Sequence, residues 1–176
     1  IYHLLLILFF FPLSVQAQKD WIPFSADEGI SFKVDAPAAL ERSSQTIKTA
    51  VGELVAHSYA HQGTEEDQNY LYLINCIRYP EDTFPRDSTA LITDFLDNAV
   101  QTAAERVGGS VVYSSNLEKD NGKLFRIKYN DGTAVIKGKS YIRGDVFIVV
   151  QVFTVQNKSL NDEMNYFLDS FRVVSE

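Results

Sequence analysis

One segment of this 176-residue chain, Asp145-Val-Phe-Ile-Val-Val-Gln-Val-Phe-Thr-Val155, indicates how the fold is organised. Its residues 146–150 are all apolar, whereas a half-buried strand alternates apolar and polar residues. A continuous apolar run of this length, flanked by turn residues, is typical of a strand that is covered on both faces. We therefore predict that this strand lies in the centre of a sheet.

Three more strand-like segments precede this run and form an antiparallel meander with it. The connections are Asp120-Asn121-Gly122, Asn130-Asp131-Gly132 and Arg143-Gly144, all of which are turn-forming sequences. Because such short turns join neighbouring antiparallel strands, the four segments are expected to lie side by side. The predicted strands are 110–117, 123–129, 133–141 and 145–155.

The first half of the chain adds further strand patterns. Residues 21–24 and 30–34 predict an edge strand or short hairpin, and residues 45–50 and 53–61 predict a second hairpin that turns at Val51-Gly52. Residues 69–79 show the strongest alternation, and we expect four of their side chains to share one face: Tyr70, Tyr72, Ile74 and Cys76.

Two helices complete the pattern. Asp87 or Ser88 is expected to cap a long amphipathic helix that Gly108-Gly109 ends. Its apolar positions follow a 3.6-residue period: Leu91, Ile92, Phe95, Leu96, Ala99, Val100, Ala103 and Val107. A second helix is expected to start at Ser159, with Asp162 completing a variant capping box, and to end the domain. Its apolar stripe is Leu160, Met164, Phe167, Leu168 and Phe171.

These elements predict an α+β fold. We expect an antiparallel β-sheet of about seven to nine strands, packed with one long central helix and a C-terminal helix. Residues 18–176 are expected to form one domain, since no repeat, low-complexity tract or linker interrupts them.

The element order resembles that of the Mog1/PsbP-like fold family, which includes small exported bacterial proteins. The resemblance is carried by Trp21, by Gly29-Ile-Ser-Phe-Lys-Val-Asp-Ala-Pro37, and by the strand through Thr46 and Thr49 to Gly52. It continues through residues 70–80, the helix after Pro85, the hairpin 123–143, the strand 145–155 and the closing helix to Phe171. The resemblance implies a sandwich that acts as a binding or assembly module rather than as an enzyme.

Residues 1–17 are expected to be a secretory signal peptide. An uncharged apolar run from Leu4 to Leu13 is followed by the small residues Val15 and Ala17, which fit cleavage before Gln18. The run is too short for a permanent membrane span, and because the chain opens at Ile1 we expect its first few residues to be missing. We predict an exported protein, periplasmic or extracellular and bacterial, with no transmembrane segment in the mature chain.

Charge and cysteine content exclude several classes of protein. The formal net charge is −7 at pH 7, which argues against a nucleic-acid partner. The single cysteine, Cys76, cannot form an intramolecular disulfide, so packing must provide the stability. We found no cofactor motif and predict none. Cys76 lies between Ile74 and Arg78 on an alternating strand and is expected to pack as a small apolar side chain.

Two groups of polar residues contain side chains of the kinds that bind metal ions. His57 and His61 lie on a predicted strand, which would separate their Cα atoms by about 13 Å, too far to bind one ion together. Glu81, Asp82 and Asp87 follow no calcium-loop spacing and are expected to be solvated turn charges. We therefore predict no metal site and no catalytic residue.

Aromatic residues provide the candidate binding site. The chain has nine tyrosines and twelve phenylalanines, and several of them are expected near one edge of the sheet. Tyr113 and Phe125 belong to this wider set. The simpler interpretation, that these rings fill the core, also fits their alternation. The predicted ligand-binding or partner-binding residues are Tyr72, Tyr79, Phe84, Tyr129 and Tyr141.

Three hypotheses for the function remain open at this point. The first is an exported non-enzymatic domain that binds a protein partner or small ligand in the cell envelope. The second is an envelope enzyme or metal-binding protein whose site is assembled from dispersed residues such as His57, His61 and Glu65. The third is a purely structural envelope protein. Convergent polar groups in a cleft favour a site, and a smooth apolar patch favours partner binding.

Overall fold

The computed structural model describes residues 20–85, 87–117 and 121–175. In these residues the chain forms ten strands, two α-helices and one short 3-10 helix. The first five strands are β1 (Ile22–Asp27), β2 (Ser31–Ala36), β3 (Glu41–Thr49), β4 (Gly52–Gln62) and β5 (Leu71–Arg78). The remaining elements are α1 (Thr89–Arg106), β6 (Ser110–Asn116), β7 (Gly122–Tyr129), β8 (Ala134–Arg143), β9 (Val146–Val155), η1 (Gln156–Lys158), α2 (Asp162–Ser170) and β10 (Arg172–Ser175).

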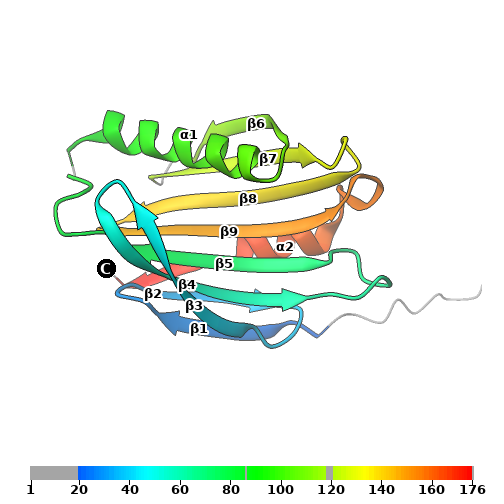
Figure 1. The fold of residues 1–176 in the computed structure, drawn as a ribbon. Helices are drawn as coiled ribbons and strands as arrows, with labels where there is room; N and C mark the ends of the chain where they lie inside the picture. The colour runs from blue at the N-terminus through cyan, green and yellow to red at the C-terminus, as the bar shows by residue number, and fades with distance from the viewer. Residues whose placement is uncertain (1–19, 86, 118–120, 176) are drawn as a thin grey trace, which may run out of the picture.

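Seven of the strands form one antiparallel sheet with the order β3-β4-β5-β9-β8-β7-β6 (Figure 1). The apolar run forms β9, the middle strand, as its sequence predicts. Ile148 lies opposite Cys76 of β5 on one side and Tyr141 of β8 on the other, and its side chain is fully buried. The predicted meander is likewise confirmed as β6 to β9.

A second, three-stranded sheet has the order β1-β2-β10. The predicted hairpin near the N-terminus forms β1 and β2, but the expectation that a helix ends the domain is wrong, because β10 follows α2 and pairs with β2. The large sheet has seven strands, within the predicted seven to nine, and the small sheet brings the described total to ten. The fold class is α+β, as expected.

The central strands of the large sheet are covered on both faces. On one face, α1 lies over β6, β7 and β8 (Figure 1), where Val100 and Ala104 pack with Phe125, Ile127 and Ile136. On the other face, α2 and the small sheet enclose the main core. That core joins residues from β2, β5, β9 and α2: Phe32, Val34, Tyr72, Ile74, Ile148, Val150, Val152, Phe167 and Leu168 among others.

The helix boundaries differ in how well the sequence predicted them. Helix α1 begins after Ser88 and ends before Gly108, whose φ of 61° suits a glycine. Helix α2 begins later than predicted: Asn161 is its N-cap and accepts a hydrogen bond from the Met164 amide at 2.7 Å. Ser159 instead follows η1, and Leu160 is 92% exposed, so neither has the predicted role.

The expected shared face of β5 is confirmed for Tyr72, Ile74 and Cys76, which are all buried in the main core. Tyr70 precedes the strand, and its ring lies beside Phe153, whose side chain belongs to the α1 face. Tyr70 therefore departs from the predicted face, because the regular alternation starts only at Leu71.

Candidate functional site

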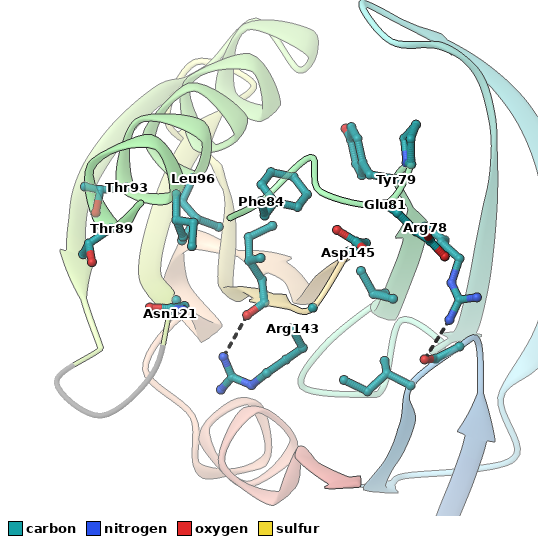
Figure 2. A pocket seen from close by; sticks show the side chains of 18 of the residues that line it. Arg78, Tyr79, Glu81, Phe84, Thr89, Thr93, Leu96, Asn121, Arg143 and Asp145 are labelled. Carbon is teal, nitrogen blue, oxygen red and sulfur yellow. Dashed lines mark hydrogen bonds between the residues drawn. The ribbon is translucent and has the colours of Figure 1, made fainter. Parts of the chain in front are cut away.

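A cleft with a volume of about 1220 Å³ opens at one end of the large sheet (Figure 2). Segments far apart in the sequence meet there: the β1–β2 turn, the end of β5 with the loop after it, the first turns of α1, the end of β6, the start of β7 and the β8–β9 turn. Its apolar lining includes Ile30, Phe84, Ile92, Leu96, Leu117, Ile142 and Val146.

The loop between β5 and α1 forms the aromatic wall of the cleft. Thr83 closes its turn by donating a hydrogen bond from Oγ1 to the Pro80 carbonyl at 2.6 Å, and Asp82 takes a positive φ of 62°. The turn places Phe84 edge-on against Tyr79 and Phe95, with ring centroids 5.2 and 4.8 Å away. Phe84 is therefore anchored in a small aromatic cluster while part of it borders the cleft.

Arg78 joins the cleft to the β1–β2 turn. Its Nη2 donates a hydrogen bond to the Gly29 carbonyl at 2.9 Å (Figure 2). Gly29 has a φ of 81°, and a Cβ atom there would lie 1.7 Å from the same nitrogen. The positive φ favours glycine at this turn, and any larger residue would also have to displace the Arg78 guanidinium.

Polar groups of both signs border the cleft. Arg143 donates from Nη1 to its neighbouring Ile142 carbonyl at 3.0 Å, and its guanidinium carbon lies 5.3 Å from the centre of the Tyr141 ring. Asp145 follows in the β8–β9 turn and lies between Phe84 and Arg78 in the view of Figure 2. Glu81 adds a second carboxylate from the opposite loop. The cleft thus combines an apolar lining with two cations and two anions.

A buried carboxylate holds the β1–β2 turn beside the cleft. Only 8% of the Glu28 side chain is exposed, and its Oε1 accepts hydrogen bonds from the Tyr59 hydroxyl and, at 2.8 Å, from Arg42. Its Oε2 lies 3.3 Å from His57 Nε2. Burial, and then the hydrogen bond to Glu28, raise the pKa of Tyr59, which keeps that hydroxyl protonated as a donor. The cluster ties the turn to β3 and β4.

The five predicted binding residues do not form one patch. Tyr79 and Phe84 border the cleft, whereas Tyr72 is fully buried in the main core. Tyr141 is buried and stacks on Phe171 with centroids 5.4 Å apart, and Tyr129 packs near the end of α1. Alternation placed these rings on opposite faces of the sheet, so only two of them meet at the cleft. Of the wider set, Phe125 is buried beneath α1 and Tyr113 is exposed on β6.

The residues considered for catalysis or metal binding are also separated. His57 contacts Glu28, and the ring of His61, farther along β4, lies 6.3 Å from the Tyr72 ring. Glu65 follows in the loop after β4, where its carbonyl accepts from Lys158. In residues 20–85, 87–117 and 121–175 no group of three His, Cys, Asp or Glu side chains is arranged to hold a metal ion.

Cys76 is buried beneath the β1–β2 turn. Burial, with a smaller contribution from Glu28, raises the pKa of its thiol to about 12. A thiol with such a pKa is protonated at neutral pH, which is the opposite of what a nucleophile needs. The prediction that Cys76 packs as a small apolar side chain agrees with its place in the main core.

Sequence reasoning missed the residues that give the cleft its charge, Arg78, Arg143 and Asp145. Each is next to a turn or loop, a position that by itself indicates only solvation. Gly29 and Arg78 are 49 residues apart, so no local sequence pattern could predict their contact. The Arg143-Gly144 turn was the one available signal, and it was interpreted only as a connection between strands.

Comparisons with known proteins support the fold. No family model matches the sequence, and no curated protein matches it significantly. Among solved structures, the chain is similar to the solution structure of cyanobacterial PsbP (CyanoP) from Synechocystis sp. PCC 6803, with a TM-score of 0.53 and 12% sequence identity. The match covers 92% of this chain and 96% of the cyanobacterial one. This chain has a PsbP-like fold.

The PsbP-like fold confirms the structural part of the predicted resemblance, along nearly the whole described chain. At 12% sequence identity the similarity shows the fold alone, and no site residue can be transferred from the cyanobacterial protein. Neither of the two described α-helices is both long and apolar enough to cross a membrane. The predicted signal peptide, residues 1–17, lies outside the described residues.

Proposed function

We propose that this protein is an exported, non-enzymatic binding or accessory domain of the cell envelope, and that the cleft at the end of the large sheet holds a peptide segment of its partner. The observation that carries the proposal is the composition of the cleft. An apolar lining would bury side chains, while Arg78, Arg143, Glu81 and Asp145 offer partners to peptide charges and amides.

The size of the cleft favours a peptide segment over a small metabolite. Ligand pockets for small molecules have volumes of roughly 300–1,000 Å³, and this open cleft, at about 1220 Å³, exceeds that range. The Tyr79 ring, packed against the buried Phe84 ring, provides rigid apolar contact area at one wall. A segment of several residues would use the rings for affinity and the charged groups for its orientation.

Two observations support a role without catalysis. The thiol of Cys76 is protonated and buried, and His57 is engaged with the Glu28 cluster that fixes the β1–β2 turn. Both residues thus have structural roles that account for their positions. Accessory and partner-binding roles are also what the resemblance to PsbP-like proteins implies.

A cleft-filling variant with a matched control tests the proposal. Thr93 borders the cleft from α1, and Thr102 lies on the same helix, exposed and away from the cleft. A randomised peptide library displayed on phage is selected against residues 18–176. Selected peptides are expected to bind the wild type and Thr102→Trp and to lose about tenfold or more in affinity for Thr93→Trp.

Two results would contradict peptide binding at the cleft. One is a selection that enriches no peptide. The other is a set of enriched peptides that bind Thr93→Trp and Thr102→Trp equally well, since those peptides would use another surface.

A further inference from the structure

Four basic side chains project from one face of β7 and β8. In the sheet register, Tyr113 of β6 lies opposite Arg126 of β7, which lies opposite Lys137 of β8. Residues directly opposite one another, and residues two apart on a strand, point to the same face. Lys128 and Lys139 therefore share the face of Arg126 and Lys137. We call these four residues the basic face.

The basic face lies on the side of the sheet that carries α2, away from α1. Lys137 Nζ donates to Asn165 of α2 at 2.7 Å, and Lys139 Nζ contacts Asp169 of the same helix at 2.6 Å. Arg126 Nη2 donates to the Ser159 hydroxyl, just before α2, at 2.6 Å. These contacts hold three of the four cations along the border of α2 and reduce their conformational freedom before any partner binds.

Helix α2 covers only part of this side of the sheet. It packs against β2, β9 and β8, and Figure 1 shows it behind β9 and β5, away from β6 and β7. The outer strand β6 is mostly exposed, with Val112 at 48% and Tyr113 at 37%. The basic face is therefore bordered by α2 on one side and by an accessible sheet edge on the other.

The positive charge on this face is incompletely neutralised. Asp169, the carboxylate that pairs with Lys139, is itself 71% exposed, so water weakens its effect. Burial lowers the pKa of Lys137, the attraction of Asp169 raises it, and smaller repulsions from Arg126 and Lys139 lower it. Like charges thus crowd together on a chain whose formal net charge is −7. A negatively charged partner would relieve this repulsion.

The adjacent edge strand favours a polypeptide as that partner. β6 ends the seven-stranded sheet, and in the described residues no strand pairs with its outer side. An extended segment can add to such an edge through main-chain hydrogen bonds. Tyr113 adds an exposed ring in the same row as Arg126 and Lys137. A membrane surface or free phosphate would use the cations but not the strand edge.

We propose that the basic face, together with the edge of β6, docks an extended acidic segment of a partner protein. The backbone of the segment would pair with β6, and its carboxylates would reach Arg126 and Lys128 on β7, the nearer strand of the basic face. Lys137 and Lys139 on β8 lie about three strand spacings, roughly 14 Å, from the added strand and would act through their positive field. This surface lies away from the end cleft and does not depend on the cleft's function.

Binding of a deca-glutamate peptide to residues 18–176 tests the proposal. The probe is expected to bind at low ionic strength, to weaken as salt rises, and to perturb the backbone NMR signals of β6, β7 and β8. The double variant Lys128→Gln/Lys137→Gln is expected to bind about tenfold or more weakly. Thr93→Trp is expected to bind like the wild type, which separates this surface from the cleft.

Lys33→Gln/Lys48→Gln is the matched control, because it removes the same charge from two exposed lysines of β2 and β3. Thermal unfolding must show that both double variants remain folded. Equal weakening in the two double variants would mean that only net charge matters, and would overturn the proposal. So would the absence of peptide binding at low salt. Vesicles of anionic phospholipid that bind this face while the peptide does not would instead assign it to a membrane.

Discussion

The two faces of β7 and β8 have opposite chemistry although they share the same backbone. Phe125, Ile127 and Ile136 point toward α1 and are buried, whereas Arg126 and Lys137 point to the other side and remain partly exposed. Strict alternation produces this division residue by residue. One pair of strands thus provides stability on one face and a charged surface on the other.

Lys123 is the exception on the apolar face. Its side chain is 7% exposed and forms an ion pair with Asp97 of α1. The pair lets a lysine be buried among apolar neighbours, because the charge is compensated by a helix residue that is itself half exposed. On the opposite face the Lys139 side chain is also mostly buried, at 17% exposure, but its partner Asp169 is 71% exposed.

The largest expected effect is at β9, where both faces are buried. Ile148→Asp would place an unpaired charge in the main core and cost several kcal/mol, against a total stability of about 5–15 kcal/mol for a typical domain. We expect loss of the folded state, measured by circular dichroism during thermal unfolding. Val155→Asp, at a 41% exposed position of the same strand, is the control and should melt cooperatively. A cooperatively melting Ile148→Asp would disprove the burial of this strand.

The next largest effect is a difference in the free energy of unfolding between substitutions at two neighbouring residues of β7, which point to opposite faces. Ile127→Ala removes a fully buried side chain beneath α1 and is expected to lower the free energy of unfolding by about 2–4 kcal/mol. Lys128→Ala, on the basic face, is expected to change it by less than about 0.5 kcal/mol. Urea unfolding of both variants measures the difference. Similar losses in the two would mean that the faces do not divide stability and charge as described.

The smallest expected effect is a fall in the free energy of unfolding at alkaline pH, caused by the buried thiol of Cys76 in the main core. The folded-state pKa of Cys76, about 12, lies above its ordinary value of 9.0, so the thiol stabilises the fold fully below pH 9 and progressively less as pH rises toward 12. By pH 10 the expected loss is about 1 kcal/mol. Urea unfolding between pH 8 and 10 measures it.

Cys76→Ala provides the control for this pH dependence. The substitution should make the decline between pH 8 and 10 smaller by about 1 kcal/mol, because no thiol remains to ionise in the unfolded chain. The decline that remains is expected from buried tyrosines such as Tyr59 and Tyr72, whose pKa is also raised. An unchanged slope in Cys76→Ala would assign the decline to other groups, and the raised pKa of the thiol would be wrong.

Much of the fold was predictable because its signals are local. The apolar run 146–150, the turn sequences between strands and the 3.6-residue period of α1 each lie within one segment. Two features were predicted wrongly, the end of the domain and the start of α2, and both lie in short segments. β10 has four residues and gains its pairing from distant β2, and Asn161 competed with Ser159 as the cap of α2. Short segments and neighbouring cap residues carry too little pattern to decide between alternatives.

The candidate site was predictable only in part, for the same reason. Tyr79 and Phe84 belong to one loop, so their proximity could be expected, and they do border the cleft. Tyr72, Tyr129 and Tyr141 were grouped with them by residue type, but alternation directs them elsewhere. The charged groups of the cleft come from turns that meet only when β5, β8 and β9 pair.

The central strand, the meander, the long helix and the α+β class follow from local sequence, because hydrophobic alternation and turn chemistry act between neighbours along the chain. Three contacts follow only from the packed structure: Gly29 with Arg78, Glu28 with Arg42, His57 and Tyr59, and four cations on one face of the sheet. These contacts depend on strand order and on which layer covers which face. Both are settled by the burial of the whole chain at once.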